Sequence, residues 1–439
     1  MAWARTPPYC CGVICLAHKS VRVTKKISAA PNDVWNTVRD FAAPWHPAIT
    51  SMWADYSGGH HTRVFNVQGD PSEYRERLTW YSNSERSMCY SHISGIAGAL
   101  AYDASLVVEE MQEGCRVVMA ADLQADEPRA CEIAQGTQAI FESGLEVLAG
   151  LDHHTPIGRV PLQTNPQVTT QIVGGTSFSV AKHPTSSTVV LFVHGIGGRR
   201  QNWADQIAAV APFATVAAMD LRGYGSSKLS SEQSTVETYC GDISDVVESL
   251  QTKQLILCGL SFGAWIVTSY AVKNPERVSA LILAGGCTGM SEALPSEREA
   301  FRKLREMPLS QGQTPADFAP GVISSIAGPC CSDAVRSELF VSMSAISVAT
   351  YTDALRCFTT PTEVFDFSRL NMPVLMMTGE FDRLAPAAEI RSVANRILNA
   401  SSKPDVRFEC LSNAGHVCNL EASAAFNEPM LELIRRVAS

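Results

Sequence analysis

The sequence predicts two domains, an N-terminal α+β domain and a C-terminal α/β domain. The first observation is length, because 439 residues exceed what one typical domain holds. The second is a series of strand patterns between residues 62 and 122 with no helix pattern among them, which indicates an antiparallel sheet. The third is a regular alternation of strand and helix patterns after residue 169, which is typical of a parallel sheet covered by helices on both faces.

The composition argues against several classes of protein. Hydrophobic residues make up 46% of the chain, which is enough for buried cores and argues against extensive disorder. The net charge of −9 disfavours a nucleic-acid or anionic-membrane partner, and no run of 18 apolar residues predicts a membrane span. Most of the fourteen cysteines lie in apolar runs, as Cys258 and Cys287 do. The sequence lacks the two Cys-x-x-Cys motifs that a zinc site of four cysteines would need, so a zinc site is not expected. We therefore expect a cytoplasmic protein with no metal site and no bound cofactor.

Residues 1–18 are expected to form an N-terminal extension outside both domains. Residues 1–5 are weakly basic and residues 10–17 form a short apolar run, an order that also occurs in targeting segments. Two interpretations stay open, a targeting signal and a disordered extension, and we favour the second.

The N-terminal domain is expected to span residues 19–152. It begins with a half-buried strand, since Val21, Val23 and Ile27 alternate with polar residues, and a helix pattern starts at Pro31. Four or five strand patterns follow, separated by Gly, Asp, Ser and Asn, at residues 62–67, 74–81, 87–94, 102–111 and 115–122. A final helix pattern repeats apolar residues at a 3.6-residue period: Ile133, Ile140, Phe141, Leu145 and Leu148. A curved sheet around this long helix would leave a cavity between them.

Several motifs of this half are similar to those of one superfamily: Asp33-Val34-Trp35, Arg39-Asp40-Phe41, Trp45-His46-Pro47, Glu76-Arg77-Leu78 and Tyr102. On these residues, the region resembles the polyketide cyclase/START-like superfamily (SRPBCC), which has the START/Bet v 1-like helix-grip fold. The resemblance implies binding of a hydrophobic ligand or, less often, catalysis of a cyclisation or dehydration. No catalytic cluster is evident in this half. Trp45, His46 and Tyr102 could line the cavity, and a hydrogen-bonded structural role is the alternative for His46.

A linker is expected at residues 153–168. Pro156, Pro161 and Pro166 occur at five-residue spacing, and no periodic apolar pattern accompanies them. Because proline removes a backbone donor and fixes φ, this spacing opposes both helix and sheet and keeps the segment extended.

The C-terminal domain is expected to span residues 169–439. Its strand patterns are nearly continuous runs of Val, Leu and Ile, as expected for strands buried on both faces, and lie at residues 188–194, 215–220, 255–259, 278–284, 373–379 and 406–411. Helix patterns lie between them at residues 202–211, 236–250, 262–273, 386–398 and 422–437.

The alternation stops over about residues 288–366, where shorter helix patterns occur at 304–307, 318–326 and 335–348. An insertion after the strand pattern at residues 278–284 would lie over the carboxyl ends of the strands, where such sheets bind their ligands, so we expect a cap. Its apolar side chains either line a binding surface or pack the cap itself: Met290, Met307, Phe318, Ile323, Leu339, Phe340, Met343 and Tyr351.

The strongest indication of chemistry is the stretch 259–263, Gly-Leu-Ser-Phe-Gly, between a strand and a helix pattern. A serine at such a sharp turn is held out of the sheet on a strained backbone, and the flanking glycines let strand and helix pass closely. The serine hydroxyl needs an adjacent base, and His416 follows the last strand pattern. Asp382 follows the preceding strand pattern and could orient that ring, with Glu380 as the alternative acid. The order Ser261, Asp382, His416 is the one expected for this architecture.

Acyl transfer also needs donors for a developing oxyanion. The N–H of Phe262 directly follows the predicted nucleophile, and the N–H of Ile196 lies in the glycine-rich loop 194–198 after the first buried strand. This loop lacks the Lys and Ser/Thr of a phosphate-binding P-loop, which removes that interpretation. We expect Phe262 and Ile196 to form the oxyanion hole.

Five elements in this order resemble the α/β-hydrolase superfamily over about residues 169–439: His194-Gly195, Asp220-x-Arg222-Gly223-x-Gly225-x-Ser227, Gly259-x-Ser261-x-Gly263, the turn at Asp382, and His416. The run from His194 to Val278 is most similar to enol-lactonase-type and small esterase members, although Ala264 stands where many relatives have a second glycine. The resemblance implies a helical cap and a serine hydrolase that cleaves an apolar carboxylic ester or lactone.

Two alternatives to hydrolysis stay open. Hydrolase-like receptors can keep an intact Ser-His-Asp triad and act by closing over a ligand, so the chain could be a ligand sensor or carrier. A cyclase activity in the N-terminal half would instead make the chain a bifunctional enzyme. Ester hydrolysis, lactone opening, C–C bond hydrolysis and acyl transfer can share one triad, and the sequence does not separate them.

Overall fold

The computed structural model describes residues 16–39, 41–42, 45–55, 62–82, 85–150 and 167–438. Most of the expected N-terminal extension, Asp40 of the N-terminal motifs, and residues 153–166 of the expected linker lie outside the described residues. The chain divides into two compact units, with the main boundary between residues 155 and 156.

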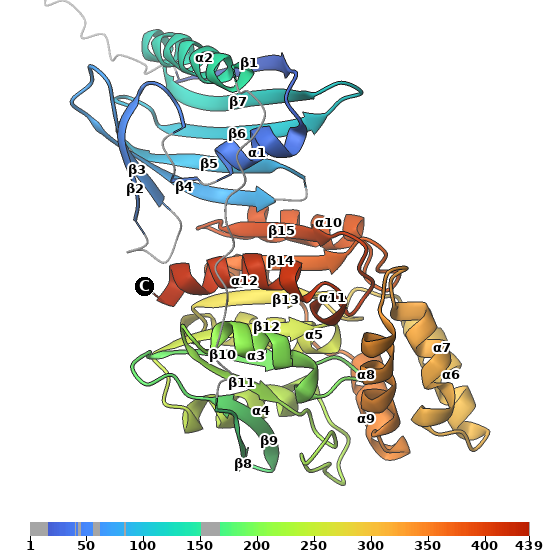
Figure 1. Ribbon diagram of the computed structural model, residues 1–439. Helices are drawn as coiled ribbons and strands as arrows, with labels where there is room; N and C mark the ends of the chain where they lie inside the picture. The colour runs from blue at the N-terminus through green and yellow to red at the C-terminus, as the bar shows by residue number, and fades with distance from the viewer. Residues whose placement is uncertain are drawn as a thin grey trace, which may run out of the picture. The chain divides into compact units, whose positions relative to one another are not determined.

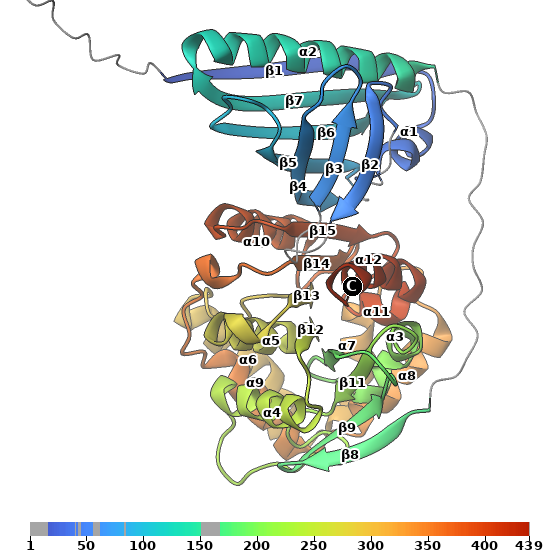
Figure 2. The same cartoon turned by 90° about the vertical axis from the view of Figure 1, so that its left-hand side faces the viewer.

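The first unit is a curved sheet with two helices (Figures 1 and 2). The strands are β1 (Leu16–Ile27), β2 (Ile49–Asp55), β3 (Thr62–Val67), β4 (Glu73–Ser82), β5 (Ser87–Ser94), β6 (Ala101–Glu110) and β7 (Cys115–Asp126). They are ordered β1-β7-β6-β5-β4, with β3 beside β4 and β2 beside β3. The pairs β1–β7, β6–β7, β5–β6 and β3–β4 are antiparallel, which confirms the sheet type predicted for this half. The helices are α1 (Pro31–Val38) and α2 (Glu127–Ala149).

Helix α2 packs against β1 and β7. It has Pro128 in its first turn, where the missing N–H has no intrahelical partner to lose. Four of the five residues predicted to face inward are buried: Ile133, Phe141, Leu145 and Leu148. The prediction for Ile140 was wrong, since its side chain is 39% exposed. Adjacent residues point about 100° apart on a helix, so Ile140 lies outside the stripe that Phe141 occupies.

Two strands of the first unit differ from those predicted from the sequence. Strand β1 begins at Leu16, so its first three residues fall within the segment assigned to the N-terminal extension. Strand β2 was not predicted at all. It lacks a buried apolar alternation, and even Trp53 within it is 45% exposed.

The second unit is built on a mixed sheet ordered β15-β14-β13-β12-β10-β11-β9-β8. The strands are β8 (Thr169–Val173), β9 (Thr176–Ala181), β10 (Thr188–Val193), β11 (Thr215–Met219), β12 (Gln254–Leu260), β13 (Ala280–Ala284), β14 (Val374–Gly379) and β15 (Val406–Leu411). Strands β8 and β9 pair antiparallel at one edge, and the pairs from β11 to β15 are parallel. Every residue of β10, β11, β13 and β14 is buried, as predicted for strands with both faces covered.

Helices cover both faces of this sheet (Figure 2). One face carries α4 (Val236–Ser249), α5 (Phe262–Lys273) and α10 (Ala387–Ala400), and the other carries α3 (Ala204–Val210), α11 (Cys418–Glu421) and α12 (Ser423–Ala438). Short 3-10 turns complete the connections: η1 (Arg200–Trp203), η2 (Pro275–Arg277) and η3 (Phe367–Arg369). The layered α/β architecture predicted for this half is confirmed. The edge strands β8 and β9 were not predicted, and their antiparallel pairing makes the sheet mixed rather than purely parallel.

A helical cap lies between β13 and β14, within the predicted insertion. It contains α6 (Pro295–Ser310), α7 (Pro315–Ile326), α8 (Asp333–Ser344) and α9 (Val348–Thr359). The single helix predicted at 335–348 is wrong, because α8 ends at Ser344. The Ser347 hydroxyl then accepts the N–H of Thr350 at 3.0 Å and starts α9 as its N-cap.

Within the part of the chain that the structure describes, no helix has the length and apolar character needed to cross a bilayer. None of the described cysteines forms a disulfide. Over the same residues, no group of three or more His, Cys, Asp or Glu side chains is arranged to hold a metal ion.

Candidate active site

Ser261 lies at the turn between β12 and α5, and its backbone is strained. Its φ is +56° and its ψ is −115°. Such a conformation costs a non-glycine residue about 1–3 kcal/mol, and it persists only where the surroundings enforce it. The Ser261 N–H donates to the Ala284 carbonyl at 2.8 Å, and the Trp265 N–H donates to the Ser261 carbonyl at 3.2 Å. Strain of this kind is concentrated at functional sites.

Two glycines permit this turn. A Cβ atom at Gly259 would overlap the backbone of Gly263 and Ala264, and a Cβ atom at Gly263 would overlap the backbone of Val193. The end of β12, the start of α5 and the end of β10 therefore approach more closely than any side chain at these positions would allow.

His416 and Asp382 are paired at the ends of neighbouring strands. His416 Nδ1 lies 2.8 Å from Asp382 Oδ2, and both side chains are buried. The backbone N–H of His416 donates to the carbonyl of Ile326, the last residue of cap helix α7, at 2.8 Å. With Nδ1 engaged by the carboxylate, Nε2 is the ring nitrogen that can exchange a proton with another group.

The Asp382 carboxylate is held by several donors. Its Oδ1 accepts two backbone N–H groups at 2.9 Å each, from the residues two and three positions further along the chain. Its Oδ2 also accepts the Thr378 hydroxyl at 3.2 Å. The alternative acid, Glu380, is exposed and accepts the N–H of Asn413 at 3.0 Å. The geometry therefore favours Asp382 over Glu380 as the partner of His416.

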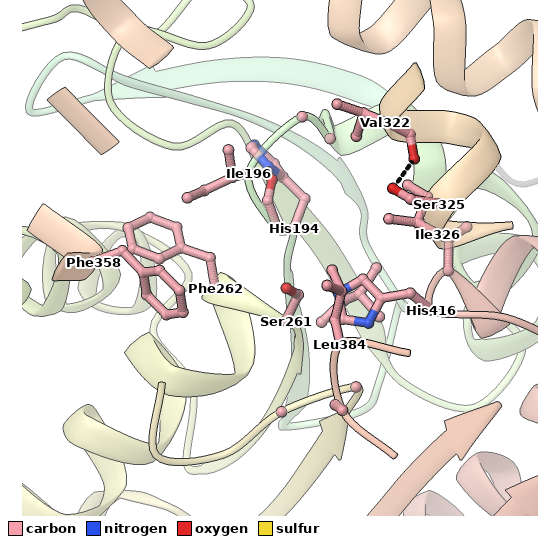
Figure 3. A pocket seen from close by; sticks show the side chains of 18 of the residues that line it. His194, Ile196, Ser261, Phe262, Val322, Ser325, Ile326, Phe358, Leu384 and His416 are labelled. Atoms are coloured by element: carbon pink, nitrogen blue, oxygen red, sulfur yellow. Dashed lines mark hydrogen bonds between the residues drawn. The ribbon is translucent and has the colours of Figure 1, made fainter. Parts of the chain in front are cut away.

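Two consecutive glycines bring Ser261 and His416 together. A Cβ atom at Gly285 would lie 3.1 Å from ring atoms of His416, and one at Gly286 would lie 3.1 Å from the Ser261 carbonyl oxygen. Both side chains line one cavity, and Figure 3 shows them beside each other there. Among the hydrogen bonds of the described residues, none joins the Ser261 hydroxyl to the ring. The structure thus places the two groups as neighbours without a direct bond.

Ile196 and Phe262 line the same cavity as Ser261. Phe262 is the first residue of α5, so its N–H has no partner inside the helix. The loop that carries Ile196 passes close to the serine, because a Cβ atom at Gly195 would lie 3.0 Å from Ser261 Cβ. No acceptor among the described residues takes the Ile196 N–H. Both N–H groups are therefore available to a ligand in the cavity.

His194 stabilises this loop through hydrogen bonds of both ring nitrogens. The Leu221 N–H donates to His194 Nε2 at 3.1 Å, so the ring proton is on Nδ1, which donates to the Gly195 carbonyl at 2.8 Å. Burial lowers the pKa of His194, which favours the neutral ring that these two bonds require. The ring also contacts Tyr224 edge-on, with 4.8 Å between centroids.

The cavity has a volume of about 650 Å³ and lies between the cap and the loops that follow the parallel strands. Six of the eight apolar cap residues named from the sequence line it: Met290, Phe318, Ile323, Leu339, Met343 and Tyr351. The other two, Met307 and Phe340, do not line the cavity and are exposed. The cap thus contributes an apolar wall opposite the candidate catalytic residues.

In the first unit, His46 is a structural residue. The Ala48 N–H donates to His46 Nδ1 at 3.1 Å, so the ring proton is on Nε2, which donates to the Ile140 carbonyl at 2.9 Å. Burial lowers the pKa of His46 and favours this neutral form. The structural alternative stated for His46 in the sequence analysis is the one that this geometry supports.

The first unit also contains an ion pair that was not predicted from the sequence. Arg63 Nε donates to Glu76 Oε2 at 2.7 Å, and both side chains are nearly buried. The Arg63 guanidinium lies 4.4 Å from the ring centroids of both Phe41 and Tyr90. A charged residue at an inward position of a strand pattern was the available signal, but the strand alone does not identify its partner on the neighbouring strand.

Comparison with protein families finds two matches in this chain. Residues 188–423 match the family described as alpha/beta hydrolase fold. Residues 18–151 match the family described as polyketide cyclase / dehydrase and lipid transport. Both family resemblances stated from the sequence are confirmed.

Individual relatives and solved structures are also similar to the C-terminal half. The 3-oxoadipate enol-lactonase 2 of Acinetobacter baylyi is 22% identical over 249 residues, which are 56% of this chain and 88% of that protein. Abhydrolase domain-containing protein abhd-5.2 of Caenorhabditis elegans is 40% identical over 108 residues, 24% of this chain and 23% of that protein. The structure of a thermophilic esterase from Thermogutta terrifontis matches with a TM-score of 0.52 and 23% identity, over 62% of this chain and 100% of that chain. The structural likeness shows the shared fold.

Proposed function

The chain belongs to the alpha/beta hydrolase family, and on that premise we propose that it is a serine hydrolase that cleaves an apolar carboxylic ester or lactone. The observation that carries the proposal is the 2.8 Å contact of His416 Nδ1 with Asp382 Oδ2, in a cavity that also holds a serine on a strained turn. A nucleophile, a base and an orienting acid around one cavity are the groups that acyl transfer requires.

In the first half of the proposed reaction, Ser261 becomes acylated. His416 Nε2 takes the proton of the Ser261 hydroxyl as Oγ attacks the carbonyl carbon of the substrate. Asp382 keeps the ring proton on Nδ1 and stabilises the imidazolium that forms. His416 then gives its proton to the departing alkoxide oxygen, which leaves an acyl group esterified to Ser261.

The oxyanion is stabilised by the backbone N–H groups of Ile196 and Phe262. They donate to the carbonyl oxygen as it gains negative charge, and one such donor contributes roughly 3 kcal/mol to the transition state. In the second half, His416 takes a proton from water, the resulting hydroxide attacks the acyl group, and the proton returns to Ser261 Oγ. The products are a carboxylic acid and an alcohol, or one hydroxy acid when the substrate is a lactone.

The cavity supports a small substrate that is largely apolar. Its volume of about 650 Å³ is within the usual range for small-molecule sites, and the cap contributes mainly apolar and aromatic side chains to its wall. An enol-lactonase and an esterase are among the similar proteins, which agrees with ester or lactone chemistry.

For the N-terminal unit we propose binding of a hydrophobic ligand, which the family match over residues 18–151 supports. Two polar groups of its interior, His46 and Arg63, are already engaged by the Ile140 carbonyl and by Glu76. They therefore give no particular support to a cyclase reaction in this unit.

Turnover of 4-nitrophenyl acetate, 4-nitrophenyl butyrate and a panel of aliphatic lactones tests the proposed hydrolysis. The wild-type protein should turn over at least one of them, and Ser261→Ala should lower kcat by about 10⁴-fold or more, as loss of a nucleophile does. Ser269→Ala is the matched control, because Ser269 lies on the same helix and its hydroxyl donates to the Trp265 carbonyl at 2.9 Å. No turnover across the panels would contradict hydrolysis and favour a sensor or carrier.

A further inference from the structure

One positively charged side chain lines the cavity on an otherwise apolar helix face. Phe301, Leu304, Arg305 and Pro308 all line the cavity, and all lie on α6. Their spacing of i, i+3, i+4 and i+7 defines one face of that helix. Arg305 is the single charged residue of the four.

The described residues give Arg305 no carboxylate partner. Its guanidinium carbon lies 3.3 Å from the ring centroid of Phe301, and Nη1 donates to the Phe301 carbonyl at 3.3 Å. Burial lowers the pKa of Arg305, and the nearby phenol of Tyr351 opposes that shift. The guanidinium therefore rests against an aromatic ring inside an apolar wall, with most of its donors unused.

Neighbouring charges on α6 are paired. Lys303 lies 2.6 Å from Glu299, and Arg302 lies 3.9 Å from Glu306. None of these four residues lines the cavity. Ion pairing is thus available to the charged residues of α6 that do not line the cavity, and Arg305 differs because it lines the cavity.

A partly buried guanidinium without a counter-charge is unfavourable, so a ligand that supplies one should bind well. Arginine stays charged at any physiological pH, and its planar fork binds a carboxylate through two parallel hydrogen bonds. One acidic residue, Glu389 in the first turn of α10, also lines the cavity. Glu389 is exposed and makes no ion pair among the described residues, which leaves Arg305 free to bind a carboxylate of the ligand.

Given the proposed hydrolysis at Ser261, on which this inference rests, we propose that Arg305 is an anion-binding subsite and that the substrate carries a carboxylate away from the bond that is cleaved. The carboxylate pairs with the guanidinium, and the intervening apolar chain lies against the cap residues. This pairing fixes which end of the substrate reaches Ser261. A neutral ester of the same size would bind without supplying a counter-charge to the buried part of the guanidinium, so the site would discriminate against it.

Two esters that differ in one charge test the subsite. Mono(4-nitrophenyl) adipate carries a free carboxylate, and methyl 4-nitrophenyl adipate is its neutral counterpart. The wild-type kcat/KM should favour the acid ester by at least about tenfold, the factor that a hydrogen bond to a charged group typically contributes. Arg305→Met should lower kcat/KM for the acid ester by roughly 10- to 100-fold, mainly through KM, and change the neutral ester less than about threefold. Arg305→Lys should recover part of the loss, because it restores the charge without the fork.

Arg302→Met is the matched control, because Arg302 lies on the same helix but does not line the cavity, and it should change the turnover of neither ester. Equal wild-type turnover of both esters, or an equal loss for both in Arg305→Met, would overturn the subsite while leaving the hydrolysis intact. An equal effect of Arg302→Met would also overturn it, since the preference would then reflect the general charge of the cap.

Binding of adipate to the Ser261→Ala variant separates the subsite from the chemistry. Adipate should raise the Tm of Ser261→Ala, and the added Arg305→Met substitution should abolish that shift. If neither ester is hydrolysed but this Arg305-dependent shift remains, the proposed hydrolysis fails and the anion subsite stands. If adipate causes no shift in Ser261→Ala, the anion subsite fails.

Discussion

Nδ1 of His416 lies 2.8 Å from Oδ2 of Asp382, although 34 residues separate them in the sequence. They follow β15 and β14, which are neighbouring parallel strands, so the loops at the carboxyl ends of these strands meet at one edge of the sheet. The cap fixes the histidine from another side through the Ile326 carbonyl. Sheet topology and cap together therefore position His416, and the Asp382 carboxylate orients its ring.

Substitution of Asp382 and of Glu380, each by its amide, tests which carboxylate orients His416. Asp382→Asn should lower kcat by about 10³- to 10⁴-fold, because an amide can favour the wrong ring tautomer and cannot stabilise the imidazolium. Glu380→Gln is the control, since Glu380 is exposed and bonds the Asn413 N–H, and it should retain nearly full activity. Steady-state kinetics on one 4-nitrophenyl ester compares the two. The opposite ranking would make Glu380 the functional acid.

Addition of a methyl group at Gly285 should displace the base. The new Cβ atom would lie 3.1 Å from the His416 ring, and Gly285 has a φ of +56°. We expect Gly285→Ala to lower kcat by roughly 10- to 100-fold through misplacement of the ring. Gly312→Ala is the matched control, because Gly312 also has positive φ but has open space around its Cβ position. The control should lower the free energy of unfolding by about 1 kcal/mol and leave kcat unchanged. Equal kcat in the two variants would contradict the role given to Gly285.

The free energy of unfolding should fall as the pH drops below about 6.5. Burial lowers the folded-state pKa of His194, His46 and His92 beneath their unfolded value of 6.5. Between the folded and unfolded pKa values the unfolded chain binds more protons, so stability rises with pH in that window and is lost as pH falls through it. Calorimetric Tm values from about pH 7.5 to about pH 5.5 measure this trend. His194→Gln should make the decline shallower, and an unchanged slope in that variant would exclude His194 as a contributor.

Removal of one partner of the buried ion pair should destabilise the first unit. Glu76→Gln leaves the Arg63 charge buried without its carboxylate, and breaking such a pair costs about 3–5 kcal/mol. Glu73→Gln is the control, since Glu73 pairs with Arg75 at 3.1 Å on the surface, where a pair contributes about 0–1 kcal/mol. Urea unfolding followed by circular dichroism measures both. Similar losses in the two variants would show that burial does not determine the contribution of the pair.

Most strands of both units could be predicted because burial leaves a direct trace in the sequence. Strands β10 and β13 are short, almost wholly apolar runs, and β1 alternates, and both patterns are typical of strands. Strand β2 could not be predicted, because its residues are only partly buried and carry no alternation. The break between α8 and α9 was also missed, since it depends on the Ser347 cap and not on apolar spacing.

Some residues of the candidate site could be predicted from the sequence and others could not. Ser261 and His416 could be named because a glycine-flanked turn and a histidine after the last strand are local sequence features. Arg305 could not, because the apolar face of α6 was recognised only in part from the sequence. A lone arginine in a cap gives no sign of facing inward until the helix bounds and the cavity are known.

The most direct measurement of whether Ser261 is a nucleophile is mass spectrometry of the protein quenched in acid during turnover of 4-nitrophenyl butyrate. A two-step reaction predicts a butyryl group on the peptide that contains Ser261, and no label on that peptide in Ser261→Ala. Turnover with no acyl group on this peptide, or a label on another residue that survives in Ser261→Ala, would contradict acyl transfer through Ser261.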